Sequence, residues 1–180
     1  MSELVNKSKL FIFSKNGTLC PGVVEKNGKS HAPNTLETQE YYPEVSAKCA
    51  ELKANGHSLA VVSNEGGVAF GILAADEAEL LVKTAMEFID GNAFRVSFYH
   101  PRGNTPPWNQ DHRSRMPQPG MLIELMQQLN FKPSDTVMVG DWESDREAAQ
   151  AAGCTFIWAN EFFERDDDFS DRLHAAMGVK

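Results

Sequence analysis

Short, mostly apolar segments alternate with longer amphipathic ones along this chain. Each short segment is four or five residues long, which is typical of strands buried on both faces of a parallel sheet. The predicted strands are residues 10–13, 58–62, 94–98, 136–139 and 155–158. Because helical patterns fall between them, the order predicts βαβ units with right-handed crossovers, and hence a three-layer α/β/α sandwich with a mostly parallel sheet.

Apolar residues at helical spacing mark the segments between these strands. The predicted helical faces are Val45, Cys49 and Leu52; Leu81, Ala85 and Phe88; and Met121, Leu122, Leu125, Met126 and Leu129, with a fourth helix from about Ser144 to Gly153. Two segments lack this period. Residues 19–42 predict a flap or hairpin over a pocket, and residues 100–118 predict a long functional loop. With no composition shift between halves, residues 1–180 are expected to form a single domain with minimal or no cap.

Composition narrows the classes of function. The formal net charge of −8 over 180 residues argues against a nucleic-acid or anionic-membrane surface, while a small phosphorylated ligand in a local pocket stays compatible. The three cysteines are far apart and favour reduced thiols. No apolar run approaches the roughly 20 residues of a membrane span, and residues 1–7 lack the apolar core of a signal peptide. A cytoplasmic location is therefore expected.

Polar residues follow three predicted strands: Ser14, Ser63 and Asp141. In an open parallel sheet, ligands bind outside the carboxyl ends of the strands, so these residues predict one shared pocket. The acidic run at residues 164–168 is interpreted as a solvated turn or helix start rather than a metal site.

The strand end Ser14-Lys15-Asn16-Gly17-Thr18 resembles the first motif of the haloacid-dehalogenase (HAD) phosphatases, Asp-x-Asp-Gly-Thr. The resemblance implies a HAD-like Rossmannoid fold. In that family the first Asp attacks phosphorus and the second moves a proton to the leaving oxygen. Ser14 and Asn16 occupy these positions here, so motif I is degenerate and both family acids are missing.

Two further blocks narrow the resemblance to the histidinol-phosphate and heptose-bisphosphate phosphatases. The block that starts at Ser63-Asn64 resembles Thr/Ser-Asn-Gln-x-Gly-Ile, and residues 115–121 resemble Arg-Lys-Pro-x-Pro-Gly-Met. Ser63, Asn64 and Arg115 are the candidate phosphate-binding residues. Alternatively, Ser63 and Asn64 cap a turn and Arg115 is an exposed loop residue. Met116 replaces the family's lysine, so motif III is degenerate too.

A fourth block, residues 137–145, matches the family's Gly-Asp-x-x-x-Asp and offers Asp141 and Asp145 as Mg²⁺ ligands, with the Asn16 backbone carbonyl beside them. Magnesium binding is expected to be possible but weakened by the loss of the carboxylate at position 14. Asp145 could instead be the acidic residue favoured in the first turn of a helix. The subgroup's zinc loop lacks its cysteines here, so no zinc is expected and the loop should be looser or differently braced.

Three hypotheses follow for function. The favoured one is a pseudophosphatase that binds a phosphorylated ligand or a protein partner without hydrolysis, since a buried lysine at position 116 would be costly once its acidic partner is gone. The second is a Mg²⁺-dependent phosphatase of weak or altered activity, in which Ser14 needs an activating base that the sequence does not supply, unless His31 serves. The third is a structural partner with a vestigial pocket.

Overall fold

The computed structural model describes residues 7–165, and within them the sheet has five parallel strands in the order β5-β4-β1-β6-β7. Their bounds are β1 (Leu10–Ser14), β4 (Ser58–Asn64), β5 (Ala93–Ser97), β6 (Thr136–Gly140) and β7 (Thr155–Trp158). Residues 10–14 pair in register with 58–62 on one side, and residues 10–13 pair with 136–139 on the other. The predicted strands and the α/β fold class are confirmed. β5 starts and ends one residue earlier than expected, β1 and β6 end one residue later, and β4 ends two residues later.

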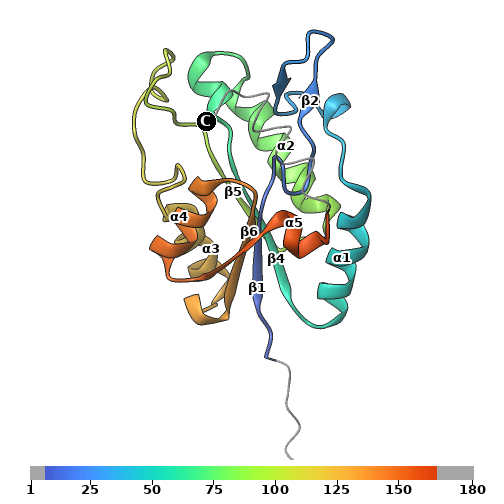
Figure 1. Ribbon diagram of the computed structural model, residues 1–180. Coiled ribbons are helices and arrows are strands. Elements are labelled where there is room, and N and C mark those ends of the chain that lie inside the picture. Colours follow the sequence, from blue (N-terminus) through green and yellow to red (C-terminus); the bar gives the residue numbers. More distant parts are fainter. Residues whose placement is uncertain (1–6, 166–180) are drawn as a thin grey trace, which may run out of the picture.

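Five helices cover the two faces of this sheet, as Figure 1 shows with α3 and α4 on one side and α1 on the other. They are α1 (Pro43–Ala54), α2 (Ala75–Phe88), α3 (Gly120–Leu129), α4 (Glu143–Ala152) and α5 (Ala159–Phe163). Three short 3₁₀ helices, η1 (Leu36–Thr38), η2 (Gly66–Phe70) and η3 (Pro133–Asp135), lie in the connections. The acidic positions 166–168 fall outside the described residues.

The strand alternation divides the core into two apolar layers. Phe11 and Phe13 pack into a cluster with residues of α1, α2 and α5, whereas Leu10 and Ile12 pack into a second cluster with residues of α3 and α4. All five residues of β1 are buried, because helices cover both of its faces. The layers fix β1 as the central strand, so its carboxyl end lies in the middle of the ligand-binding edge.

The predicted helical faces are mostly confirmed, with one error. Phe88 is 41% exposed instead of buried, and its ring stacks on Tyr41 with centroids 3.7 Å apart. The buried face of α2 is made instead by smaller or branched residues that fit closely against β4 and β5: Ala78, Leu81, Val82 and Ala85. No helix within residues 7–165 combines the length and apolar character needed to cross a membrane.

The segment predicted as a flap forms a small antiparallel hairpin of β2 (Val23–Val24) and β3 (Ser30–His31), which rises above the carboxyl edge of the sheet in Figure 1. Its base is firmly anchored, since Leu19 and Cys20 are fully buried. The fold therefore places a hairpin, and no further domain within the described residues, beside the strand ends.

The long loop between β5 and α3 is braced by aromatic rings. The Tyr99 and His112 rings stack with centroids 3.9 Å apart, and the Trp108 ring meets Tyr99 and Phe98 edge-on at 5.1 and 5.2 Å. The backbone N–H of His100 also donates to the Trp108 carbonyl at 3.0 Å. Of the two alternatives expected for this loop, looser or differently braced, the structure shows the second: aromatic rings and a backbone hydrogen bond hold it.

Candidate functional site

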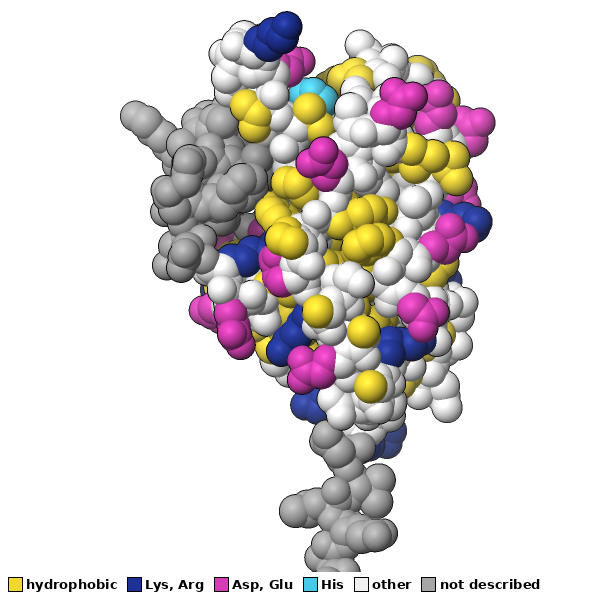
Figure 2. All heavy atoms as spheres, turned by 90° about the vertical axis from the view of Figure 1, so that its right-hand side faces the viewer, with side chains coloured by type: hydrophobic (Ala, Val, Ile, Leu, Met, Phe, Trp, Pro, Cys, Tyr) yellow, Lys and Arg dark blue, Asp and Glu magenta, His cyan; other side chains and the backbone are white. Residues whose placement is uncertain are grey.

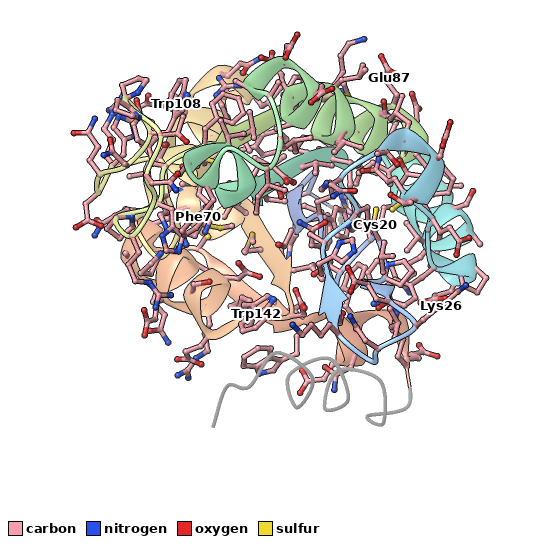
Figure 3. All side chains as sticks on the ribbon, turned by 90° about the horizontal axis from the view of Figure 1, so that it is seen from above. Cys20, Lys26, Phe70, Glu87, Trp108 and Trp142 are labelled. Carbon is pink, nitrogen blue, oxygen red and sulfur yellow. The ribbon has the colours of Figure 1, made fainter. Side chains whose placement is uncertain are left out.

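A cavity of about 280 Å³ opens at the carboxyl ends of β1 and β4, between the hairpin, α4 and the long loop. Figure 3 looks down on this edge, with Trp142 at the start of α4 on one side and Cys20 at the base of the hairpin on another. Six of the seven predicted site residues line the cavity: Ser14, Asn16, Ser63, Asn64, Arg115 and Asp145. The fold thus brings together residues more than a hundred positions apart in the sequence.

Ser14 and Asp145 lie next to each other at the cavity floor, close enough for the Ser14 side chain to lower the pKa of Asp145. Asp145 Oδ2 accepts the backbone N–H groups of Asp141 and Trp142 at 3.3 Å each. Burial raises the pKa of Asp145 to about 6, against the lowering effect of these hydrogen bonds. The expectation that no base lies beside Ser14 is therefore wrong, because position 145 is brought back to β1 by the tight turn that starts α4.

Asp145 also does what its position in α4 suggests. As the third residue of the helix, it accepts the backbone N–H of the capping residue Trp142. Gly140 makes this possible: a Cβ at that position would lie 2.5 Å from Asp145 Oδ2. The acidic first-turn interpretation and the site interpretation therefore both describe the same side chain.

Asp141 lies behind the turn that follows β1 and does not line the cavity. Its Oδ1 accepts the Thr18 hydroxyl at 3.2 Å, and a Cβ on Gly17, where φ is +78°, would fall 1.7 Å from its Oδ2. Only glycine therefore fits at position 17. Burial, followed by the nearby Asp145 carboxylate, raises the pKa of Asp141 well above its usual range.

A buried ion pair that the sequence analysis missed lies beneath the cavity. The Lys15 side chain is fully buried, and its Nζ is 2.9 Å from Oε1 of Glu65, which is itself 5% exposed. Lys15 Nζ also lies 3.3 Å from Gln39 Oε1, so the chain beyond the hairpin is tied to the end of β1. Two signals in the sequence could have indicated the pair. Glu65 stands where the resembled motif has a glutamine, and Lys15 follows the last residue of a buried strand.

Glu65 Oε1 is shared by two predicted site residues, the phosphate-binding candidate Ser63 and the degenerate catalytic position Asn16. It accepts the Ser63 hydroxyl at 2.7 Å and the Asn16 Nδ2 at 3.5 Å, in addition to its contact with Lys15. With the Asn16 amide nitrogen turned this way, Asn16 Oδ1 is buried and has no hydrogen-bond partner among the described residues. A buried acceptor without a donor is destabilising unless a ligand or ion reaches it.

Asn64 and Arg115 connect the cavity to the third motif. Both ends of the Asn64 amide bind the backbone of Met116, at 2.9 and 3.1 Å, so this side chain fixes the position of the motif III segment. Arg115 is the one arginine or lysine among the described residues that line the cavity, and its NH1 donates to the Tyr99 carbonyl at 3.0 Å. Met116 is 3% exposed and packs in the apolar core. The phosphate role of Ser63, Asn64 and Arg115 stays a prediction.

Arg165 holds the turn after β1 from outside the cavity. Its NH1 and NH2 donate to the carbonyls of Gly17 and Thr18 at 3.3 and 2.8 Å, and its Nε contacts Glu44 of α1. Its guanidinium carbon lies 3.7 Å from the ring centroid of Tyr42. Arg165, two residues beyond the end of α5, therefore helps to set the shape of the turn that carries Asn16.

The oxygens at this edge fit a magnesium ion bound through few protein ligands. Asp141 supplies a buried carboxylate and Asn16 Oδ1 lacks a partner, while Asp145 is already held by backbone N–H groups. Within residues 7–165 there is no group of three or more His, Cys, Asp or Glu residues that could hold a metal. Such a donor set suits Mg²⁺ completed by water and phosphate rather than a closed metal cage.

The other candidate groups have limited chemistry. His31 is brought to the cavity wall by the hairpin, where its Nδ1 lies 2.7 Å from the Ala32 carbonyl. Burial raises the pKa of the Cys20 thiol to about 12, which keeps it protonated and weakly nucleophilic. Arg115 is the group on the cavity wall suited to an oxyanion, and two hydroxyls at the strand ends, Ser14 and Ser63, lie beside the carboxylates of Asp145 and Glu65.

The sequence is similar to those of known haloacid dehalogenase-like proteins. A family model for haloacid dehalogenase-like hydrolases matches residues 109–159. The heptose-1,7-bisphosphate 7-phosphatase of Rhodopseudomonas palustris is 27% identical over 137 residues, covering 73% of this chain and 75% of that enzyme. These matches confirm the predicted resemblance to the haloacid-dehalogenase-like superfamily and to its heptose-bisphosphate-phosphatase-like subgroup.

Other relatives and solved structures agree with this assignment. The corresponding enzyme of Escherichia coli K12 is 30% identical over 122 residues, covering 65% of this chain and 64% of the enzyme, so the chain spans slightly less than two thirds of that relative. A HAD-like protein of Mesorhizobium loti aligns with a TM-score of 0.70 at 19% identity, over 94% of this chain and 87% of its own. The heptose bisphosphate phosphatase of B. bronchiseptica, solved with magnesium and phosphate, aligns with a TM-score of 0.66 at 18% identity. The alignment covers 82% of this chain and 78% of that enzyme. At these identities the structures show the fold.

Proposed function

We propose that this HAD-like domain binds a small phosphorylated molecule at the carboxyl edge of its sheet and does not hydrolyse it through a covalent aspartyl intermediate. One observation carries the proposal. At the end of β1, the family's attacking and proton-transferring acids are replaced by the Ser14 hydroxyl and by the Asn16 amide, both on the cavity wall. An amide cannot act as a general acid or base, and a serine is a weak nucleophile.

The charges around the cavity support binding more than turnover. Phosphoryl transfer depends on cations placed against the charge that develops in the transition state. Here Met116 is apolar and buried, and the Lys15 ammonium is withdrawn into its pair with Glu65. Arg115 remains as a donor on the cavity wall. When bound, Mg²⁺ held by Asp141 and the Asn16 backbone carbonyl would add positive charge against a phosphate, and its binding would be weakened by the missing carboxylate at position 14.

The first test separates binding from hydrolysis. The purified chain is given inorganic phosphate, and binding is followed by calorimetry and by the shift in melting temperature, which a ligand of the folded state must raise. Phosphate release is then measured with Mg²⁺ on heptose bisphosphate and on other sugar, nucleotide and generic esters. We expect binding without release. Rapid release that Asp141→Ala abolishes would contradict the proposal.

A rescue experiment tests the same point from the other side. The triple variant Ser14→Asp, Asn16→Asp, Met116→Lys restores the groups that the motifs lack, and it should gain phosphatase activity if the remaining site is intact. The double variant without Met116→Lys is the matched control, since it adds two acids and no cation. A folded triple variant that fails to bind Mg²⁺ would show that the pocket has lost the family's geometry.

A second candidate is a phosphatase of altered mechanism, favoured by the position of the Ser14 hydroxyl beside the Asp145 carboxyl group. A hydroxyl next to a carboxylate base is the minimal arrangement for an activated nucleophile. Ser14→Ala would abolish turnover by this route, and mass spectrometry would find phosphate on Ser14. Turnover that survives Ser14→Ala excludes it.

The third hypothesis, a structural partner with a vestigial pocket, needs a surface for a protein. Figure 2 shows hydrophobic side chains gathered on the face beside α1, with acidic side chains around them. On the described surface, a groove of about 340 Å³ between η1 and α2 includes Leu36 and Leu80, which are 48% and 46% exposed. The protein partner and the cytoplasmic location both stay predictions.

A further inference from the structure

The hydroxyl of Ser63 has its proton directed away from the cavity. Ser63 is 2% exposed, and its Oγ lies 2.7 Å from Glu65 Oε1. A carboxylate only accepts hydrogen bonds, so the single proton of this hydroxyl is given to Glu65. Toward a ligand, the Ser63 oxygen can therefore accept a hydrogen bond but cannot donate one.

Glu65 cannot easily release this proton. Its carboxylate is 5% exposed and is held against the fully buried Lys15 ammonium, 2.9 Å away. Removing a hydrogen-bond donor from a buried anion costs free energy because no water replaces the donor. A glutamine, which the resembled motif has at this position, carries an N–H₂ group and would not impose the same direction.

A neighbouring group at the end of β1 has the same polarity. Asn16 turns its Nδ2 toward Glu65 Oε1, 3.5 Å away, which leaves Asn16 Oδ1 without a partner among the described residues. The side-chain oxygens of Ser63 and Asn16 thus share one property: each can accept a hydrogen bond and neither has a proton to donate toward a ligand.

We propose that this position selects an oxyanion that carries its own proton, such as a phosphate monoanion or a singly protonated phosphate ester, against one that has none, such as sulfate. This inference rests on the proposed phosphate binding and adds its selectivity. Arg115 supplies charge and donors from the cavity wall, while the acceptors contributed by Ser63 and Asn16 require a donor on the ligand. An unprotonated oxygen facing them would bring lone pairs against lone pairs. Glu65 is the specificity-determining residue.

The experiment compares inorganic phosphate with sulfate by calorimetry on the wild-type chain, at a mildly acidic pH where phosphate keeps a proton and at constant ionic strength. The two anions are similar in size and shape, so the difference isolates the proton. We expect phosphate to bind at least about tenfold more tightly, the value of one well-made hydrogen bond against one unmade.

Two variants assign the selectivity to Glu65. Replacing Glu65 alone would strand the Lys15 charge, so the pair is removed together as Lys15→Met/Glu65→Leu, which frees the Ser63 proton to point at the ligand. Sulfate should then bind better and the ratio should fall to roughly threefold or less. Ser63→Ala, which removes one acceptor and leaves the ion pair in place, should lower the ratio as well. Glu51→Gln, on the exposed face of α1, is the matched control and should leave the ratio unchanged.

The outcomes distinguish the two proposals. A wild-type chain that binds no phosphate overturns the proposed function, and the selectivity falls with it. Equal binding of phosphate and sulfate overturns the selectivity alone and leaves phosphate binding intact. A ratio that persists in both variants overturns the assignment to Glu65.

Discussion

The two halves of the cavity edge handle buried charge in opposite ways. At the ends of β1 and β4, Lys15 and Glu65 form an ion pair that also holds polar neighbours. At the end of β6, Asp141 and Asp145 lie close together, and the pKa of each is raised, above all by burial. A buried charge with a partner can stay ionised, whereas one facing a like charge shifts toward its neutral form. The first half balances its charge within the protein, whereas the two acids of the second half form no ion pair within residues 7–165 and are the proposed Mg²⁺ ligands.

The largest effect is expected from breaking the charge-balanced half. Lys15→Met leaves the Glu65 carboxylate buried without its counter-ion, which should lower the free energy of unfolding by roughly 3–5 kcal/mol. Lys15→Met/Glu65→Leu should recover most of that loss, because replacing both partners removes the unpaired charge. Chemical unfolding of the three proteins gives the result. A double variant no more stable than the single one would argue against the pair.

At the end of β6, by contrast, replacing a buried acid should raise the free energy of unfolding. The folded pKa of Asp145, about 6, lies above the unfolded value of 3.8, so the folded state holds this proton more tightly. The favourable contribution is fully present below the unfolded value and is lost as pH rises through the folded one. Wild-type stability should therefore carry a component that falls between about pH 4 and 6.

Asp145→Asn sharpens this test because it removes the titration and keeps an oxygen for the backbone N–H groups. At neutral pH the variant should be more stable than wild type by up to roughly 3 kcal/mol, from two pKa units of difference. The gain should vanish toward pH 4. Chemical unfolding curves of both proteins, collected across this pH range, measure the difference in stability. A gain in stability that does not change with pH would indicate a packing effect instead. Added Mg²⁺ should reduce the gain by neutralising Asp141 and its neighbour.

A smaller effect is expected at Arg165, which lies near both halves. Its side chain is 14% exposed, donates to the Gly17 and Thr18 carbonyls and stacks on Tyr42. Arg165→Ala should cost about 1–2 kcal/mol and speed hydrogen exchange in the turn after β1. Arg146→Ala, an exposed arginine on α4, is the matched control and should change neither quantity.

The fold could be predicted well from the sequence because its signals are local. Apolar runs such as residues 136–139 have one consistent environment, and helix ends such as Gly153 are marked by their own residue type. The error at Phe88 arose where a ring packs sideways onto Tyr41 at the end of α2, which helical spacing does not describe.

The polarity of the site was less accessible to sequence reasoning. The motifs placed Ser14, Ser63 and Asp145 at one edge, and the cavity brings them together. The polarity of each group depends on contacts between residues far apart in the chain, such as Ser14 with Asp145. Lys15 was hidden for a related reason, since its partner Glu65 is fifty positions away and a lysine at a strand end is usually solvated.

The loop beside the cavity has a practical consequence for the cell. It is held by stacked rings of Tyr99, Trp108 and His112 and by backbone bonds, and residues 98–112 contain no thiol. Oxidation of cysteine has no target in this segment. The mouth of the pocket should therefore keep its shape under oxidising conditions that would open a loop held by cysteine thiolates.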